Sequence, residues 1–268
     1  MSQHPTQITN STQLPPHSLL TTPIQKQVLV VTHQKQSSSG AIGHVLREQG
    51  YHLDVRCPAQ GDHLPPDLEH HEAVVVFGGF MSANDDDKLD FIRQELNWIP
   101  TILETKKPFL GVCLGAQMLA KVLGGQVTTH AEGMTEIGYF PIEPIFNPTI
   151  PEGQHFHTPR HVYHWHQEGI ELPRTAIKLA TGDTFSTQAF SYGGHAYGVQ
   201  FHPEMTTELM KKWLTLGIDM LTRPGAQSPE EQIKNHALYG DDSLHWLQEF
   251  IPFWLEGSLA PVKSSVLK

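Results

Sequence analysis

The chain has 268 residues, enough to bury a full hydrophobic core and to form one large domain, or one domain with a small extension. Hydrophobic residues make up 38% of it and charged residues 17%, which excludes a fibrous or wholly disordered protein. The formal net charge is -10 and no basic cluster is longer than two lysines, so a role in binding nucleic acid or an anionic membrane is disfavoured. Two cysteines give no disulfide framework, and we see no signal peptide and no apolar run of roughly 20 residues. We therefore expect a cytoplasmic protein.

The first half of the chain alternates between β-prone and helical segments after a polar start. Residues 1–26 are rich in Ser, Thr, Gln and Pro and are predicted to be a disordered tail. The segments that follow are predicted as strand 28–32, helix 40–50, strand 51–56, strand 73–79, a helix over 88–106 broken near Pro100, and strand 108–112. This alternation predicts an α/β fold with a parallel sheet, whose ligands lie beyond the carboxyl ends of the strands.

The second half has a different pattern. Residues 127–200 contain short alternating pieces separated by Gly, Pro and Asp, which predict antiparallel strands with a hairpin turn at 192–194. From residue 206 onward the pattern is helical. We expect a main domain over residues 27–220 and a helical extension over 221–268 packed on it.

Cys113 lies in the most informative segment, KPFLGVCLGAQMLAKVLGG. A β-prone stretch is followed by a cysteine between Gly111 and Gly115, and then by a good helix former. This order predicts a strand, a tight turn and a helix, since the glycines remove Cβ atoms that would clash in the turn. The cysteine would then face the positive end of the helix, which stabilises a thiolate. We interpret Cys113 as a nucleophile rather than as a packing cysteine.

A cysteine nucleophile needs a base, and the segment YGVQFHPEM contains a candidate. The run VQF is predicted as a strand with His202 at its end and Glu204 two residues further on. Residues two apart in extended backbone face the same side, so the Glu204 carboxylate could orient the His202 ring. Together with Cys113 these residues have the pattern of a nucleophile, a base and an orienting acid.

The motifs GVCLGAQ, FGGFMS and YGVQFHPEMT, in this order, resemble those of the class I glutamine amidotransferases. The resemblance is closest to freestanding proteins similar to the amidotransferase half of GMP synthase. It implies a flavodoxin-like open, mostly parallel sheet flanked by helices, with a small antiparallel β subregion and a helical C-terminal extension. It also implies that Cys113 is the nucleophile, His202 the acid/base and Glu204 its orienting partner.

The resemblance further implies an oxyanion hole made of the backbone N–H groups of Gly79 and Leu114. Gln117, Gly78 and His166 would lie at the substrate. The resemblance implies no cofactor and no metal.

The sequence departs from the family pattern in two places. Phe80 stands where the family usually has a proline after the paired glycines. Gln167 and Glu168 stand where the family has Gly-Asp, in a loop near the glutamine site of its members. Both departures bear on which substrate is accepted.

Two further clusters are open to a functional interpretation. Five histidines within residues 153–166 suggest a metal site, but their spacing fits solvated loop residues better. The acidic run over 84–90 is most simply a helix-capping loop, and binding of a cation or amine is the alternative.

The resemblance implies hydrolysis of the side-chain amide of glutamine, which releases ammonia. The destination of that ammonia is open. The chain has no phosphate-binding loop motif, and only about 60 residues follow His202, too few for a synthetase domain. The first hypothesis is glutamine hydrolysis, with ammonia passed to a separate synthetase or released. The second is hydrolysis of γ-glutamyl conjugates through the same thioester. The third is a non-catalytic metal- or ligand-binding protein on this fold.

Overall fold

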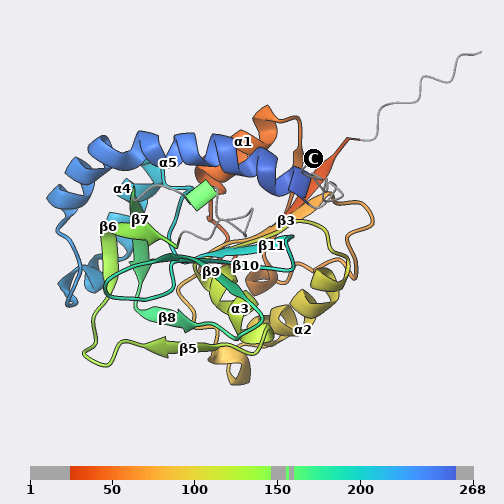
Figure 1. The fold of residues 1–268 in the computed structure, drawn as a ribbon, viewed down its shortest axis with the longest axis horizontal. Coiled ribbons are helices and arrows are strands. Elements are labelled where there is room, and N and C mark those ends of the chain that lie inside the picture. The colour runs from red at the N-terminus through yellow and green to blue at the C-terminus, as the bar shows by residue number, and fades with distance from the viewer. Residues whose placement is uncertain (1–24, 146–154, 157–159, 258–268) are drawn as a thin grey trace, which may run out of the picture.

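A computed structural model describes residues 25–145, 155–156 and 160–257, so nearly all of the predicted tail lies outside the described residues. Nine strands form one mixed sheet (Figure 1). Their order is β2 (His52–Arg56), β1 (Gln27–Val31), β3 (Ala73–Val76), β4 (Phe109–Val112), β11 (Ala196–Val199), β10 (Ala189–Tyr192), β9 (Ile177–Thr181), β6 (Glu136–Pro144) and β7 (Arg160–His166). The pairings from β2 to β11 are parallel and those from β11 to β7 are antiparallel. A second, two-stranded antiparallel sheet joins β5 (Gln126–Thr129) to β8 (Glu168–Glu171).

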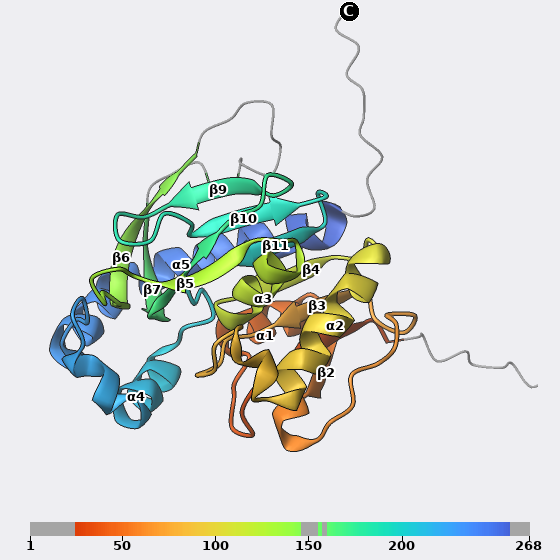
Figure 2. The ribbon, with the colours of Figure 1, turned by 90° about the horizontal axis from the view of Figure 1, so that it is seen from below.

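Helices cover both faces of the parallel part of the sheet (Figures 1 and 2). The helices α1 (Gly40–Glu48) and α5 (Pro229–Gly257) lie on one face, and α2 (Asp90–Glu104) and α3 (Leu114–Val122) lie on the other. Successive side chains of β1 alternate between these two cores, as the pleat requires. The expected α/β sheet is therefore confirmed, and the carboxyl ends of β3, β4 and β11 meet at one edge.

Three predicted element bounds were wrong. Helix α2 runs unbroken through Pro100, whose ring is exposed while the buried Ile99 and Ile102 hold the helix against the sheet. Strand β3 ends at Val76, so both paired glycines lie in the loop that follows. Strand β11 ends at Val199, and the predicted strand residues after it lie in an irregular segment that turns toward the following helix. The hairpin predicted at 192–194 joins β10 to β11.

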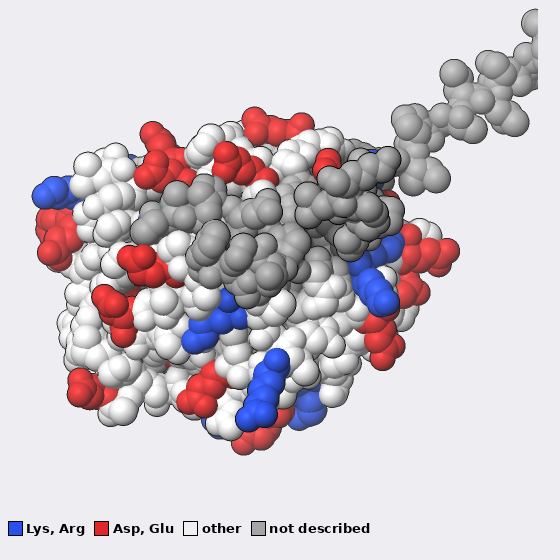
Figure 3. Space-filling model, in the orientation of Figure 1, with Lys and Arg blue, Asp and Glu red and all other residues white. Residues whose placement is uncertain are grey.

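The C-terminal part of the described chain is helical. Helix α4 (Thr207–Leu216) and the short helix η4 (Ile218–Thr222) precede α5, which packs along α1 and against β6 and β7. The boundary after residue 220 stays a prediction. No helix among the described residues is long and apolar enough to span a membrane. On the face drawn in Figure 3, acidic and basic side chains are interspersed rather than gathered by sign.

Candidate active site

Cys113 lies at the sharp turn between β4 and α3. Its backbone has φ 50° and ψ −104°, a conformation that residues other than glycine rarely adopt. Its N–H donates to the Val199 carbonyl of β11 at 2.8 Å, which fixes the turn against the neighbouring strand. A Cβ atom at Gly115 would lie 2.0 Å from the Val76 oxygen, and one at Gly111 would lie 2.6 Å from the Gly115 oxygen. The flanking glycines are thus needed because the turn passes this close to the backbone.

His202 faces Cys113 from the segment after β11. Its backbone N–H donates to the Tyr163 carbonyl at 2.7 Å, and its Nδ1 lies 2.8 Å from Glu204 Oε1. Both side chains are buried, and the indole of Trp213 packs edge-on against the imidazole with ring centroids 4.7 Å apart. The imidazole is therefore held in one orientation by a carboxylate, a strand and an aromatic ring.

The charges around His202 favour its protonated form. Burial lowers the pKa of His202, but the charges of Glu204 and Cys113 and the hydrogen bonds to both outweigh burial and raise the pKa to about 10. A protonated imidazole beside a cysteine at a helix N-terminus is the arrangement in which a thiolate is stable.

A second side chain, Gln200, also contacts the sulfur. Its Nε2 lies 3.6 Å from Cys113 Sγ, within range of a weak N–H···S hydrogen bond. Its Oε1 accepts from Gln117 Nε2 at 3.3 Å, and the same Gln117 nitrogen donates to the Glu168 carbonyl at 3.1 Å. Gln117, predicted at the substrate, thus lies one turn along α3 from Cys113 and holds Gln200 in place. No feature of the motif singles out Gln200 before the fold is known.

The predicted oxyanion-hole residues lie next to each other. A Cβ atom at Gly79 would be 2.9 Å from Leu114 Cδ2, so the loop after β3 passes over the start of α3. A Cβ atom at Gly78 would be 2.8 Å from His202 Cε1 and 3.4 Å from Cys113 Cβ, so a larger residue there would collide with the imidazole. The structure brings these residues together beside the sulfur.

A buried pair that sequence reasoning missed holds this loop from behind. His33 Nδ1 donates to the Gly78 carbonyl at 3.0 Å, and His33 Nε2 lies 3.0 Å from Glu95 Oε2. Both side chains are fully buried. Burial lowers the pKa of His33, but the Glu95 carboxylate and the hydrogen bonds to Glu95 and Gly78 outweigh burial and raise it. Two signals could have found the pair: His33 follows a strand at its carboxyl end, and Glu95 interrupts the apolar face of α2.

Two cavities meet at Cys113, one on each side of Gly79 and Phe80. The first contains the His202 side of the sulfur and extends toward α4 and the loop after β1, with about 650 Å³ of empty space when the open solvent at its mouth is included. The second lies over the start of α3 and the loop between β7 and β8, with about 570 Å³ on the same measure. The second cavity is lined by Gly79, Phe80, Met81, Cys113, Gln117, Trp165, His166, Gln167, Glu168, Met220 and Arg223.

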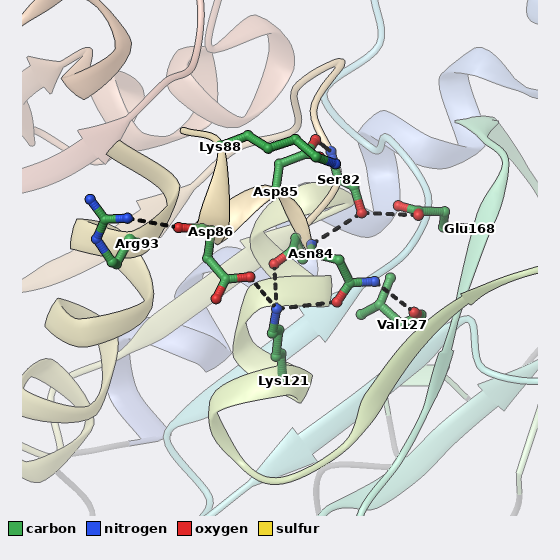
Figure 4. A network of polar contacts seen from close by, with 10 residues as sticks. Ser82, Asn84, Asp85, Asp86, Lys88, Arg93, Lys121, Val127 and Glu168 are labelled. Atoms are coloured by element: carbon green, nitrogen blue, oxygen red, sulfur yellow. Dashed lines mark hydrogen bonds and ion pairs between the residues drawn. The ribbon is translucent and has the colours of Figure 1, made fainter. Parts of the chain in front are cut away.

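The loop after β3, which contains the acidic run, is held by a network of polar contacts (Figure 4). Ser82 Oγ donates to Glu168 Oε1 at 2.9 Å and so fixes that carboxylate. Lys121 of α3 donates to Asn84 Oδ1 at 3.1 Å and to Asp86 Oδ1 at 2.8 Å, which ties the loop to the helix. The predicted capping role was wrong for α2, whose N-terminus has no side-chain cap. The run instead anchors its own loop through Lys121.

One group of potential metal ligands occurs among the described residues: Glu136, His164 and His166. Glu136 Oε2 lies 3.0 Å from His166 Nε2 and 3.4 Å from His164 Nδ1, and it accepts from Gln188 Nε2 at 2.8 Å. His166 Nδ1 donates to the Glu168 carbonyl at 3.0 Å. These contacts form a buried hydrogen-bond network that fixes His166 at the wall of the second cavity. Part of the predicted histidine segment, including His157, lies outside the described residues.

Comparison with known proteins is consistent with this geometry. Residues 30–218 match the family described as glutamine amidotransferase class-I. The glutamine amidotransferase-like protein YfeJ of Salmonella typhimurium (strain LT2) is 30% identical over 192 residues, which are 69% of this chain and 78% of YfeJ. Gamma-glutamyl peptidase 5 of Arabidopsis thaliana is 31% identical over 148 residues, which are 54% of this chain and 58% of that protein. Glutamine-hydrolyzing GMP synthase subunits from Ignicoccus hospitalis and Saccharolobus solfataricus match as well.

A solved structure is similar over nearly its whole length. The glutamine amidotransferase of Thermotoga maritima has a TM-score of 0.78 and 30% identity, and the match covers 87% of this chain and 99% of that one. It thus has no large domain beyond the shared part, which agrees with the expected freestanding group. The family match, the relatives and the shared fold together show that the chain belongs to the glutamine amidotransferase class-I family.

Proposed function

We propose that this protein hydrolyses the side-chain amide of glutamine or of a γ-glutamyl compound through a thioester on Cys113. The observation that carries the proposal is the buried chain of contacts from Cys113 to His202 and from His202 Nδ1 to Glu204 Oε1 at 2.8 Å. Membership of the amidotransferase family supports the same reaction.

In the first step the Cys113 thiolate attacks the γ-carbonyl carbon and the carbonyl oxygen becomes an oxyanion. We assign the stabilisation of this oxygen to the N–H groups of Gly79 and Leu114, and one such donor contributes about 2.7–4 kcal/mol to lowering the barrier in comparable enzymes. His202 donates its proton to the departing nitrogen, the C–N bond breaks, and a γ-glutamyl thioester remains. The protonated His202 described above is the acid that this step requires.

In the second step water cleaves the thioester. His202, now neutral, takes a proton from water, and the hydroxide attacks the thioester carbon. The C–S bond breaks, glutamate leaves, and Cys113 and His202 return to their starting charges. Glu204 keeps the imidazole oriented in both steps, and water is the only co-reactant.

The second cavity suits the α-amino and α-carboxylate groups of the glutamyl end. Glu168 offers a carboxylate, held by Ser82, for the ammonium, and Arg223 offers a guanidinium for the carboxylate. Gln117 and His166 line the same cavity. Glu168, one of the two departures from the family pattern, therefore takes a place in substrate binding.

The fate of the released amine separates two forms of this function. The relatives from Ignicoccus hospitalis and Saccharolobus solfataricus are by name subunits of a glutamine-hydrolyzing synthase, which supports ammonia transfer to a separate synthetase. The similarity to a γ-glutamyl peptidase supports hydrolysis of γ-glutamyl conjugates by the chain alone. Low glutaminase activity that rises on adding a partner favours the first form, and turnover of conjugates by the isolated chain favours the second.

The reaction itself is tested by ammonia and glutamate release from the purified chain, with Cys113→Ala and Cys57→Ala as a matched pair. Both cysteines are buried and free, but only Cys113 lies at the site. We expect Cys113→Ala to abolish release and to prevent labelling by a glutamine-like electrophile, while Cys57→Ala retains both. Full biological activity of Cys113→Ala would instead favour the non-catalytic hypothesis.

A further inference from the structure

The two cavities at Cys113 have different chemical roles in the proposed reaction. His202 must protonate the departing nitrogen, so the leaving amine lies on the side of the sulfur that His202 occupies. His202 and Glu204 line the first cavity and not the second. The glutamyl group therefore extends into the second cavity, and the leaving amine extends into the first.

The first cavity is open to solvent. About 650 Å³ of empty space lies among its lining residues when the open solvent at its mouth is included. Ammonia is similar in size to a water molecule, which occupies about 30 Å³ in the liquid, and does not fill this space. A leaving group with a side chain of its own can therefore extend from the sulfur along the cavity wall toward solvent.

The outer wall of this cavity is apolar. Phe80 and Leu216 are 59% and 61% exposed, and the half-buried Trp213, which packs edge-on against His202, belongs to the same lining. Large apolar side chains that remain this exposed around a cavity are typical of a surface that a ligand covers. Phe80 also stands where the family usually has a proline, so its ring adds apolar surface to this wall in the present chain.

Besides the protonated His202, one lysine lies in the same lining. Lys212 of α4 is half-buried, and its ammonium donates to the Gln36 carbonyl in the loop after β1. No carboxylate of the described residues forms an ion pair with it. A carboxylate on the leaving amine would find this ammonium at the cavity wall, as a charge-assisted hydrogen bond requires.

We propose that the first cavity is a subsite for a leaving group that is itself an amino acid with an apolar side chain. The substrate class is then a γ-glutamyl amino acid such as γ-glutamyl-phenylalanine, and the products are glutamate and the free amino acid. The apolar side chain packs on Phe80, Trp213 and Leu216, and the α-carboxylate binds Lys212. This inference rests on the proposed function, because the leaving amine departs from the same thioester-forming step.

Four substrates separate the parts of this proposal. Glutamine has ammonia as its leaving group, γ-glutamyl-glycine adds the carboxylate, γ-glutamyl-phenethylamide adds only the apolar ring, and γ-glutamyl-phenylalanine has both. We expect kcat/KM for γ-glutamyl-phenylalanine to exceed that for glutamine by at least about tenfold, since filling an apolar pocket and pairing a charge each contribute that much in other enzymes.

Two matched pairs of variants test the residues. Lys212→Gln should lower the ratio of kcat/KM for γ-glutamyl-phenylalanine over γ-glutamyl-phenethylamide by about tenfold, whereas Lys211→Gln, outside the lining, should keep the wild-type ratio. Leu216→Ser should lower the ratio of γ-glutamyl-phenylalanine over γ-glutamyl-glycine, and the equally exposed Ile218→Ser should not. A ratio of two kcat/KM values for the same variant cancels any effect of Lys212→Gln on the loop after β1 that both substrates share.

The outcomes distinguish the subsite from the reaction. Glutamine turnover equal to or faster than that of γ-glutamyl-phenylalanine overturns the subsite and leaves the proposed function standing. Equal effects of Lys212→Gln and Lys211→Gln overturn the assignment of the carboxylate. No turnover of any of the four substrates overturns the proposed function, and the subsite with it.

Discussion

At the scale of single residues, Glu204 controls the pH at which His202 carries its proton. The Glu204 charge is a main reason that the pKa of His202 is raised to about 10 in spite of burial. In the proposed reaction activity is therefore retained at neutral pH and lost as pH rises through about 10, where the acid for the leaving group disappears. We expect Glu204→Gln to lower kcat by at least about a hundredfold and to move this alkaline limb to lower pH. A pH–rate profile of kcat measures both effects.

The control for Glu204 is Glu208, an exposed acid in the first turn of α4. Glu208→Gln makes the same chemical change a short distance along the chain, and its pH profile should match the wild type. If the alkaline limb of Glu204→Gln stays near the wild-type position, the carboxylate does not set the protonation of His202 as we infer.

His33 acts on the reaction through one peptide bond. The peptide between Gly78 and Gly79 is planar and trans, so fixing the Gly78 carbonyl toward His33 points the Gly79 N–H the other way, as the proposed role of this N–H in the oxyanion hole requires. We expect His33→Leu to lower kcat by about 10²- to 10³-fold with little change in KM, as loss of one oxyanion donor does. Steady-state kinetics on the folded variant give this split between kcat and KM.

The conservative variant His33→Asn separates positioning from packing. An asparagine amide can donate to the Gly78 carbonyl although it cannot also reach Glu95, so part of kcat should return. Equal kcat for His33→Asn and His33→Leu, with both variants folded, would contradict the positioning role and leave only a structural one.

The residues differ in how far the sequence can predict them. Cys113 is flanked by its glycines, and His202 and Glu204 are two residues apart, so local motifs indicate them before any fold is known. His33 and Glu95 are 62 residues apart and meet only because β1 lies beside β3 and α2 covers that face. Gln200 lies within the YGVQFHPEM motif, but nothing in the motif indicates that its amide reaches the sulfur.

At the scale of elements, α3 depends on the absence of a side chain at Gly115. A Cβ there would lie 2.0 Å from the Val76 oxygen, and neither β3 nor the helix can give way because both are buried. We expect Gly115→Ala to destabilise the protein by at least about 3 kcal/mol, as severe overpacking does, and to displace the elbow. Gly240→Ala in α5 is the matched control: its Cβ would meet ring atoms of the His236 side chain at 3.0 Å rather than a buried backbone, so the loss of stability should be well below that of Gly115→Ala. Denaturant unfolding of both variants measures this difference, and equal losses would contradict the argument.

Element type was easier to predict than element bounds. The apolar period of α2 is strong enough that its packing outweighs the loss of one backbone hydrogen bond at Pro100, so the expected break is absent. Gln200 and Phe201, which follow β11, look like a continued strand in the sequence, but they lie in an irregular segment that carries His202. Tertiary packing decides both cases, and a local pattern does not contain that information.

At the scale of the whole molecule, the sequence indicates the parallel half of the sheet but not its antiparallel half. Alternating strands and helices have one common solution, a parallel sheet with helices on both faces. The order β11-β10-β9-β6-β7 depends on long-range pairings, such as that of β6 with β9, which no local pattern specifies. This half contains the buried network of Glu136, His164 and His166, so the fold places three ionisable side chains in its interior.

That network makes the stability of the fold depend on acid. Burial lowers the pKa of His164, the Glu136 charge opposes this, and the charges of His166 and His202 lower it further, so the pKa is about 3 against an unfolded value near 6.5. Between these values the unfolded chain binds one more proton than the folded chain, so His164 makes the free energy of unfolding fall by about 1.4 kcal/mol per unit as pH drops from 6.5 toward 3. We expect His164→Phe, beside Phe140 and Phe201, to flatten this slope, while His70→Phe on the surface should keep it. Urea unfolding between about pH 7 and pH 5 measures the slope, and a His164→Phe slope as steep as that of the wild type would show that other groups cause it.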